Sequence, residues 1–529
     1  MTVNLRYLGL FKLLLFIIFN VLPSSVNANS PKFIDRATEL NIQHIYTGGW
    51  EHFVGGGVAA FDCNGDGYPE IYLSGGNSRD QLFLNTSADA NGRVTFKIIE
   101  TTSEIGTVGV YPLDIDSDGW LDLFLLKVGE NKILRGGPDC SFSLANERFG
   151  YQDHGMWSTA FSATWERGQS LPTLAVGNYV DRDHKDAPFG TCENNQLYRP
   201  QDNSYLAPHT LSPGFCSLSM LFSDWGRTGR QDLRVSNDRH YYVRGGAEQL
   251  WKMQDKPTLY SKTEGWNNHS IWGMGIASRD ITGDGISEVY LTSMGDQKLQ
   301  FLKEDGKPSF ENARFEVGVT AQRPYVGGDG RPSTGWHAEF GDVDNDGVDD
   351  LFVTKGNVDQ MPDAAMADPN NLMMGQPNGR FIEVGLEAGV ASLHRARGAV
   401  VVDLNLDGLL DIVVVNRRAN VEILENMSKD TGSYLSLKIE QKGSNPSAVG
   451  AWIEVKAGER VWHREITIGG GHASGHAGFH HFGIGKETKA QIRILWPGGG
   501  KSNWYEVDVN QHIVLEKSGT ELLVTNLEF

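Results

Sequence analysis

A nine-residue acidic pattern recurs along this chain of 529 residues and constrains its fold more than any other feature. Written as D-x-[DNT]-x-D-G-x-x-[DE], it starts at Asp62, Asp114, Asp280, Asp342 and Asp403. Four oxygen-bearing side chains within nine residues repel one another unless a cation lies between them. Runs rich in β-branched and aromatic residues follow each copy, so each copy is predicted to be a turn between two strands.

The ligand spacing predicts a Ca²⁺ site in each of the five turns, because Ca²⁺ prefers six to eight oxygen ligands in a flexible geometry. The predicted side-chain ligands occupy positions 1, 3, 5 and 9. The backbone carbonyl of position 7 is added by analogy with the EF-hand loop, whose last acid stands at position 12 instead. In chain order the predicted ligands are Asp62, Asn64, Asp66, Tyr68 and Glu70; Asp114, Asp116, Asp118, Trp120 and Asp122; Asp280, Thr282, Asp284, Ile286 and Glu288; Asp342, Asp344, Asp346, Val348 and Asp350; and Asp403, Asn405, Asp407, Leu409 and Asp411. For a single copy, an Asp/Gly-rich turn without an ion is the alternative.

Two further segments keep only part of the pattern. Residues 224–232 retain the first and last acids, but Gly226 offers no side-chain ligand and Arg227 adds a competing charge. Residues 177–183 keep a place in the repeat and lose the ligand spacing. Both are predicted to bind no metal, with ion pairs of Arg182 or Arg227 to carboxylates in its place.

Counted from Asn178 for the third, the seven segments start 46 to 64 residues apart, which is typical of the blades of a β-propeller with short strands and Gly-rich turns. The sequence therefore predicts seven blades within residues 29–430. A Phe-led motif at 96–99, 315–317 and 381–384 recurs at 33–36, before the first turn. The N-terminal copy is predicted to complete the last blade, because ring closure removes open sheet edges.

Beyond residue 430 the repeat stops and alternating apolar and polar residues take over. Such alternation indicates strands with one buried face, and it occurs at 435–440, 451–455, 461–466, 491–496 and 512–515. Residues 431–529 are therefore predicted to form a small, self-contained β-sandwich. The predicted fold class is all-β, a seven-bladed propeller followed by this sandwich.

Residues 1–28 are predicted to be a signal peptide. Arg6 and Lys12 precede an apolar stretch at 13–22, and a small-residue cleavage site follows at 26–28. An uncleaved anchor is the alternative, but the apolar stretch is shorter than the roughly 20 residues a spanning helix needs. No other segment is apolar enough to span a membrane. The mature protein is expected to be secreted, periplasmic or on the cell surface.

Four cysteines allow two disulfides in an oxidising compartment, with three possible pairings. Cys192 with Cys216 is the preferred pair, because both lie in an irregular region. No C-x-x-C spacing supports a metal site for these cysteines. The formal net charge of −19 excludes nucleic acid as a partner, because phosphates would be repelled.

The turns resemble the FG-GAP/VCBS repeats of integrin-type β-propellers. The C-terminal segment resembles the ASPIC/UnbV domain at 445–451, 469–471, 481–485 and 496–500. In this order the two resemble the cartilage acidic protein family and its bacterial relatives, as do 176–182 and 232–238. The resemblance implies a secreted Ca²⁺-binding, integrin-like propeller with an accessory β-domain, and it implies no catalytic site.

No nucleophile elbow, P-loop, zincin motif or dinucleotide fingerprint occurs in the sequence. The glycine runs at 55–57 and 469–471 are interpreted as bends or close backbone approaches. His472, His476, His480 and His481, with His463 upstream, could bind Zn²⁺ or Cu²⁺, although a structural role in a Gly-rich loop is favoured. Aromatic residues near the turns either wedge between blades or stack on a ligand: Trp50, Trp120, Trp225, Trp272 and Trp336.

The sequence thus favours a non-enzymatic, calcium-binding module for adhesion to an extracellular protein or glycan, expected to be a monomer. The rival hypothesis is an extracellular enzyme acting on polysaccharide or lipid at the propeller mouth. That enzyme would need a carboxylate or histidine cluster at the central mouth, separate from the calcium turns.

Overall fold

The computed structural model describes residues 30–527, except 90–91, 100–103, 186–189, 239–242, 244, 305, 328 and 359–360. The predicted signal peptide at 1–28 lies outside the described residues. No helix in the described part of the chain is long and apolar enough to cross a membrane.

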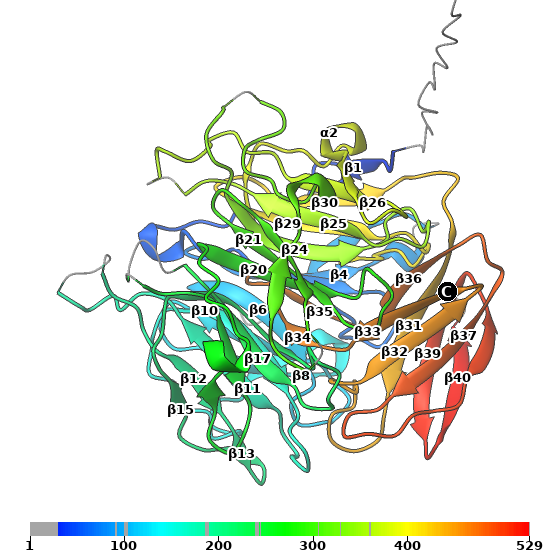
Figure 1. Ribbon diagram of the computed structural model, residues 1–529, viewed down its shortest axis with the longest axis horizontal. Coiled ribbons are helices and arrows are strands. Elements are labelled where there is room, and N and C mark those ends of the chain that lie inside the picture. Colours follow the sequence, from blue (N-terminus) through cyan, green and yellow to red (C-terminus); the bar gives the residue numbers. More distant parts are fainter. Residues whose placement is uncertain are drawn as a thin grey trace, which may run out of the picture.

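Strands dominate the described chain, and their antiparallel pairing groups most of them into seven four-stranded units around a common axis (Figure 1). The first three units are β2 (Val58–Phe61), β3 (Glu70–Leu73), β4 (Gln81–Asn85) and β5 (Phe96–Ile99); β6 (Thr107–Leu113), β7 (Asp122–Lys127), β8 (Lys132–Gly137) and β9 (Ser141–Leu144); and β10 (Ser158–Thr164), β11 (Thr173–Asn178), β12 (Asn195–Tyr198) and β15 (His209–Leu211). The fourth is β16 (Ser217–Ser223), β17 (Asp232–Asn237), β18 (Gln249–Lys252) and β19 (Thr258–Leu259).

The remaining units follow in the same order around the ring. They are β20 (Gly273–Arg279), β21 (Glu288–Ser293), β22 (Lys298–Leu302) and β23 (Phe310–Asn312); β24 (Gly335–Gly341), β25 (Asp350–Lys355), β26 (Asn371–Gly375) and β27 (Phe381–Glu383); and β28 (Arg395–Val402), β29 (Asp411–Arg417), β30 (Glu422–Asn426) and β1 (Phe33–Asp35). Second strands such as β7 and β25 are buried along their whole length. Their near-continuous apolar sequence reflects burial on both faces.

The N-terminal strand closes the ring, as the sequence predicted. β1 pairs with β30 antiparallel, with Phe33 opposite Asn426. The side chain of Asn85, in the first unit, donates to the backbone carbonyl of Leu404 in the last unit at 2.8 Å. Asn426 donates in the same way to Val343 of the unit before it, at 2.9 Å. The closing contact therefore repeats a contact between neighbouring units elsewhere in the ring.

Two elements differ from the sequence-based prediction. The third turn was placed at 177–183, but Asn178 ends the second strand of its unit, β11, so the turn equivalent to the acidic ones is 165–172. The placement was wrong because 165–172 carries no acidic pattern that could mark it. The Phe-led motif forms a strand at 33–35, 96–99 and 381–383, but its copy at 315–317 forms a 3-10 turn that ends at Gly318, which has φ of 91°. The outer strand of that unit is β23.

The C-terminal residues form two four-stranded sheets with a shared core. One sheet contains β36 (His480–Gly485), β31 (Ser433–Glu440), β39 (Gln511–Ser518) and β40 (Glu521–Leu527); the other contains β33 (Arg460–Glu465), β32 (Trp452–Ala457), β37 (Lys489–Leu495) and β38 (Tyr505–Asp508). Side chains from both sheets, including Leu437, Ile453, Ile492 and Ile513, meet in one buried cluster. This arrangement is a sandwich of alternating, half-buried strands.

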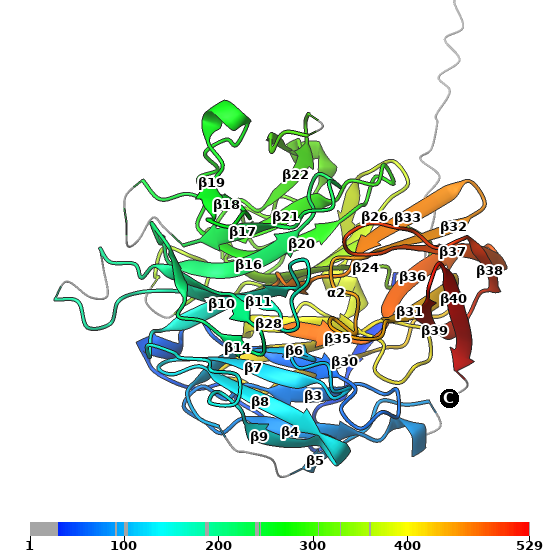
Figure 2. The same ribbon diagram turned by 90° about the horizontal axis from the view of Figure 1, so that it is seen from below.

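The sandwich is not self-contained, because its chain sends residues 468–477 into the axis of the propeller. β34 (Ile468–Gly469) pairs with both β10 and β16 and so joins the third and fourth units into one nine-stranded sheet. β35 (Gly475–Ala477) pairs in parallel with β2 of the first unit. Figures 1 and 2 both show this segment among the innermost strands of the ring. We call residues 468–477 the axial segment.

Glycines make room for the axial segment. A Cβ atom on Gly57 would lie 2.0 Å from the carbonyl oxygen of Ala473, and one on Gly469 would lie 2.7 Å from the carbonyl oxygen of Phe161. The glycine runs at 55–57 and 469–471 are therefore close backbone approaches, as predicted. His472 is fully buried at the axis, with Nε2 2.7 Å from the carbonyl of Val54.

Candidate functional site

The five acidic turns lie on one side of the ring, because each joins the first strand of its unit to the second. Position 1 follows the first strand and position 9 begins the second. At the ends of the turns, Phe61 pairs with Glu70, Leu113 with Asp122, Arg279 with Glu288, Gly341 with Asp350, and Val402 with Asp411. The repeat thus places five equivalent sites around one face of the propeller.

Backbone hydrogen bonds hold the carboxylates of every turn in the same orientation. The glycine N–H at position 6 donates to the position 1 carboxylate at 2.7–3.0 Å. The N–H of position 2 donates to the position 9 carboxylate at 2.8–2.9 Å. The N–H of position 7 donates to the position 5 carboxylate at 2.8–3.0 Å. These bonds fix the acids at the turn before any ligand arrives.

The position 6 glycines are required by the backbone. Their φ angles lie between 86° and 93°, in the left-handed region that favours glycine. They are Gly67, Gly119, Gly285, Gly347 and Gly408. The pattern carries a glycine at this position in all five copies.

The position 9 acids are buried, at 2% exposure or less. Burial, followed by the neighbouring acids, raises the pKa of Glu70, Asp122 and Glu288 to about 8. Burial also raises the pKa of Asp350 and Asp411 well above the usual range, with the same neighbours as the second cause. A buried carboxylate beside other carboxylates is costly unless a cation compensates it.

The acids converge as a metal site requires. In the second and fourth turns, one oxygen from each of positions 1, 3 and 9 lies within 4.8 Å of the other two. Within the described residues, Oδ1 of Asp116 and Oδ1 of Asn405, both at position 3, are buried and accept no hydrogen bond. Buried hard oxygens without a partner fit a Ca²⁺ ion, which takes carboxylate, amide and carbonyl oxygens.

An arginine already contacts the second turn, which sequence reasoning missed. Nε of Arg135 lies 2.8 Å from Oδ2 of Asp116, and the same guanidinium also contacts Asp118. Arg148 approaches Asp116 to 3.2 Å. Arg135 lies on β8 and reaches the turn only through strand pairing, so no local sequence signal reveals it. The second turn is therefore partly neutralised.

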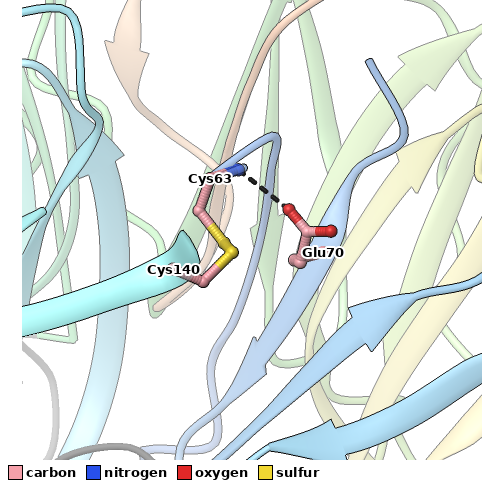
Figure 3. A group of neighbouring side chains, drawn as sticks. All are labelled: Cys63, Glu70 and Cys140. Carbon is pink, nitrogen blue, oxygen red and sulfur yellow. Dashed lines mark hydrogen bonds between the residues drawn. A yellow bond between two sulfur atoms is a disulfide. The ribbon is translucent and has the colours of Figure 1, made fainter. Parts of the chain in front are cut away.

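A disulfide stands beside the first turn. Cys63, at position 2, is bonded to Cys140, and its N–H donates to the position 9 acid Glu70 (Figure 3). Cys140 belongs to the second unit, so this first disulfide links two neighbouring units next to the predicted site.

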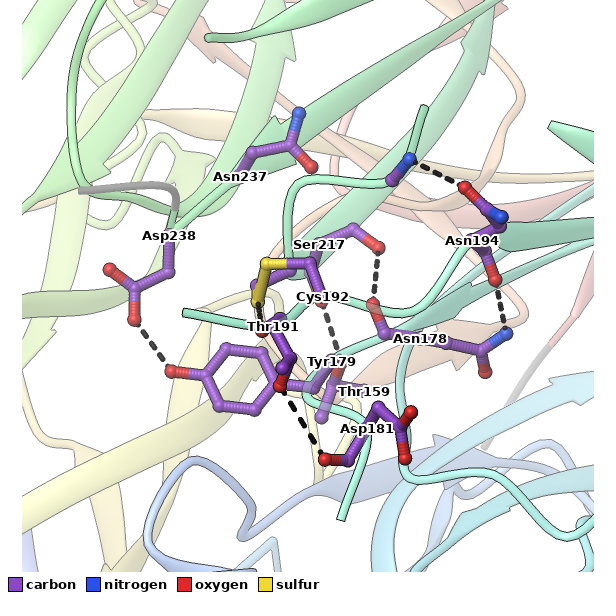
Figure 4. Close-up of a disulfide and its surroundings, with 12 residues drawn as sticks. Thr159, Asn178, Tyr179, Asp181, Thr191, Cys192, Asn194, Ser217, Asn237 and Asp238 are labelled. Carbon is purple, nitrogen blue, oxygen red and sulfur yellow. Dashed lines mark hydrogen bonds between the residues drawn. A yellow bond between two sulfur atoms is a disulfide. The ribbon is translucent and has the colours of Figure 1, made fainter. Parts of the chain in front are cut away.

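The second disulfide joins Cys192 to Cys216, the pair preferred from the sequence (Figure 4). It links the third and fourth units on the other side of the ring. Tyr179, drawn nearby, donates from its hydroxyl to Asp238 at 2.6 Å. The Cys192–Cys216 disulfide, like the first one, links two units that are neighbours in the ring.

In the degraded turn at 224–232, an arginine pairs with the last acid. Nε of Arg230 lies 3.0 Å from Oδ1 of Asp232, and the hydroxyl of Tyr260 donates to the same carboxylate at 2.8 Å. Ion pairing was predicted for this turn, but the residue that supplies it is Arg230. Arg227 instead pairs with Glu454 of the sandwich at 3.0 Å. Arg182 pairs with Glu51 at 3.1 Å, and neither residue belongs to an acidic turn.

The sandwich covers several of the acidic turns. Nδ1 of His463 lies 2.8 Å from Oδ2 of Asp280, and Nε2 of His512 lies 3.3 Å from Oδ2 of Asp403. In both turns this oxygen is the one that accepts the glycine N–H. The indole of Trp462 donates to the carbonyl of Gly347 at 3.1 Å. Turn geometry and sandwich docking are therefore physically connected.

The histidines considered above as a Zn²⁺ or Cu²⁺ site do not form a group of converging ligand atoms in the described residues. His472 lies at the axis and His481 contacts Asn345 at 2.7 Å, as structural residues do. His476 points elsewhere, with Nδ1 3.2 Å from Oε1 of Glu339. His337 contacts the other oxygen of Glu339, also at 3.2 Å.

The mouth of the propeller therefore holds a histidine–carboxylate cluster, formed by His337, Glu339 and His476. Burial tends to raise the pKa of Glu339, but the two imidazoles outweigh it and lower that pKa to about 2. Burial lowers and Glu339 raises the pKa of His476, and the rise prevails. In the described residues these three groups are not among those whose ligand atoms converge within 4.8 Å.

The tryptophans near the turns are mainly structural. Trp336 is 1% exposed, donates to the carbonyl of Gly356 and stacks under Arg397 at 4.1 Å. Trp225 is 9% exposed and donates to Asp232. Trp50, 36% exposed, packs edge-on against Trp157. Wedging between blades, one of the two interpretations given from the sequence, fits Trp225 and Trp336, because each packs in a buried cluster with residues of neighbouring units.

Comparison with protein families gives two matches. Residues 62–125, which contain the first two turns, match the model of the FG-GAP-like repeat, and residues 441–522 match that of ASPIC and UnbV. The chain carries an FG-GAP-like repeat followed by an ASPIC/UnbV domain. The ASPIC/UnbV match contains the axial segment, so this domain is the part that enters the FG-GAP-like propeller. No curated protein matches the chain.

Solved structures resemble the chain only weakly. A lectin from Agrocybe aegerita, solved for its recognition of non-reducing terminal N-acetylglucosamine, covers 71% of this chain and 94% of its own, at 14% identity and a TM-score of 0.39. BBS1N in complex with ARL6DN covers 71% of this chain and 92% of its own, at 8% identity and a TM-score of 0.41. Likenesses at this level carry no conclusion about a ligand.

Proposed function

We propose that this protein is a non-enzymatic extracellular binding or adhesion module, in which Ca²⁺ held by the five acidic turns fixes the face of the propeller. Its partner is an extracellular protein or glycan. The observation that carries the proposal is the convergence of the largely buried carboxylates of Asp342, Asp344 and Asp350 in the fourth turn. Oδ1 of Asp116 and Oδ1 of Asn405, in two other turns, are also left without a hydrogen bond in the described chain. Bound Ca²⁺ would supply the positive charge that this arrangement lacks.

The residues of each turn would supply the ligands of the ion. Positions 1, 3, 5 and 9 supply side-chain oxygens, and the carbonyls of Tyr68, Trp120, Ile286, Val348 and Leu409 complete each set. His463 and His512 contact Oδ2 of two position 1 carboxylates, the oxygen that also accepts the glycine N–H, and so help to fix the orientation of these carboxylates. A turn fixed in this way presents a rigid surface, which lowers the entropic cost of binding a partner.

Two disulfides support an extracellular setting, because disulfides persist in oxidising compartments. FG-GAP-like repeats and ASPIC/UnbV domains are generally non-catalytic modules, which supports the non-enzymatic assignment. The axial segment occupies the centre of the ring, where a substrate would otherwise enter. His472 is fully buried there.

The experiment is a thermal melt of the purified mature protein with millimolar Ca²⁺ and with EGTA. Ions that bind only the folded state stabilise it by mass action. EGTA should lower the melting temperature and added Ca²⁺ should restore it. An unchanged melt, with no calcium found by elemental analysis, would reject the proposal.

An enzyme acting at the mouth is the second candidate, and the His337–Glu339–His476 cluster is the observation that favours it. Incubation with polysaccharide and lipid-ester substrates, followed by product analysis, tests it. Turnover that is abolished by Glu339→Gln would establish the enzyme. No turnover by the wild type would reject the enzyme, and equal turnover in the wild type and this variant would reject the cluster as its site.

A further inference from the structure

A cavity of about 500 Å³ lies between the turn side of the propeller axis and the sandwich. The propeller contributes the ends of β6, β20 and β24, and the sandwich contributes β31 and the end of β33. The axial segment forms the floor. This volume is in the range of small-ligand sites, which run from about 300 to 1,000 Å³.

One wall of the cavity carries a fixed hydrogen-bonding pair. Glu339 is oriented by three contacts: His337 at 3.2 Å, His476 at 3.2 Å and the backbone N–H of Val401 at 3.1 Å. Its carboxylate is thus pre-positioned as an acceptor. The side chain of His476 keeps 34% of its surface free although it lies deep in the fold, because that surface faces the cavity. Nδ1 engages Glu339, and the ring therefore has Nε2 to offer to a ligand.

Another wall is aromatic. Trp120 and Trp165, both half-buried, line the cavity from two neighbouring turns. Trp165 also packs against the core of the sandwich and against the core between the second and third units, which fixes its position. Trp120 is position 7 of the second acidic turn, so ion binding there would hold its backbone in place.

The charges around the cavity do not favour a strongly charged ligand. Arg279, Lys438 and Arg464 line it, and Glu339, Glu440 and Glu465 line it as well. Asp62 and Asp114 also reach it, but they belong to predicted calcium turns, where an ion would offset them. Glu465 is already engaged by Ser223, Gln231 and the N–H of Asp224.

We propose that this cavity binds a neutral carbohydrate of about one or two sugar rings. Trp120 and Trp165 would contact the C–H face of the sugar. Glu339 would accept a hydrogen bond from one of its hydroxyl groups, and His476 would donate a hydrogen bond to another. This inference rests on the proposed function and specifies the ligand class for a glycan-binding module. The proposed ligand is neutral because the wall mixes cationic and anionic side chains and does not present one sign alone.

The test is isothermal titration of the calcium-loaded full-length mature protein with galactose, mannose, xylose and N-acetylglucosamine. Glucuronic acid and glucosamine serve as charged comparisons. At least one neutral sugar should bind, and Glu339→Gln should weaken it at least tenfold. His476→Gln should weaken it by a similar factor, and it decides the question if Glu339→Gln fails to fold. Trp50→Ala, outside the cavity lining, is the matched control and should change the affinity less than twofold.

Each outcome discriminates. No binding of any neutral sugar, tighter binding of a charged sugar, or unchanged affinity in a folded Glu339 or His476 variant overturns the inference. A calcium-dependent melt without sugar binding overturns it while leaving the calcium proposal intact. Sugar binding in a protein whose melt ignores EGTA would instead reject the calcium proposal and retain the cavity.

Discussion

Replacing Gly57 by alanine tests whether the axial segment holds the propeller and sandwich together. The backbone of Gly57 is not in the left-handed region, so alanine meets no conformational penalty there. Its Cβ, however, would lie 2.0 Å from the carbonyl oxygen of Ala473, which must retreat by more than about 1 Å to reach an ordinary contact. That movement breaks the bond from Val110 N–H to Ala473 at 2.9 Å and disturbs the pairing of β35 with β2.

The expected loss is about 3 kcal/mol, from about 1–3 kcal/mol for overpacking and about 1 kcal/mol for each buried hydrogen bond lost. Urea unfolding followed by tryptophan fluorescence and circular dichroism measures it. Gly49→Ala is the matched control, because its Cβ meets nothing within 4 Å. The control should stay within about 0.5 kcal/mol of the wild type. Equal midpoints for the two variants would refute the view that the axial segment is packed against Gly57.

Three further results are expected. Asp344→Ala should remove one bound calcium ion by elemental analysis while Asp232→Ala removes none, and the reverse result would invert the ranking of the turns. The first disulfide spans 77 residues and the second spans 24. Because loop-closure entropy grows with loop length, replacing both cysteines of the first should lower the free energy of unfolding in urea by about 1 kcal/mol more than replacing both cysteines of the second. An equal or smaller loss for the first disulfide contradicts this. Burial raises the pKa of Glu465 from 4.5 to about 7. Between these pH values the folded state keeps a proton that the unfolded state releases. The free energy of unfolding should therefore fall as the pH rises through this window. Glu465→Gln should flatten that slope in urea titrations at pH 4.5–7, and an unchanged slope would assign it to other groups.

Local chemistry made the turns predictable. Position 6 needs glycine, and positions 1, 5 and 9 place acids where backbone N–H groups orient them, so a nine-residue window is sufficient. Ring closure was also accessible, because residues 33–36 repeat a motif found elsewhere in the chain. The preferred pairing of Cys192 with Cys216 followed from their shared irregular region, whereas nothing local pointed Cys63 to Cys140.

The rest depends on contacts between distant parts of the chain. β34 and β35 have two and three residues, too few for any periodicity, and the glycines around them gave no direction. The third turn lacks the spaced acidic pattern, so its place was assigned to a later segment. Arg135 and His512 reach the acidic turns only after the strands pair and the sandwich docks. Glu339 and His476 meet across 137 positions in the sequence numbering.

Calcium in the turns is the central claim, and an anomalous difference map from crystals grown with Ca²⁺ tests it most directly. The account predicts peaks in the turns that begin at Asp62, Asp114, Asp280, Asp342 and Asp403, each about 2.3–2.6 Å from its oxygen ligands. No peak is expected at 224–232, where Arg230 holds Asp232. A map without peaks in the five turns would contradict the account.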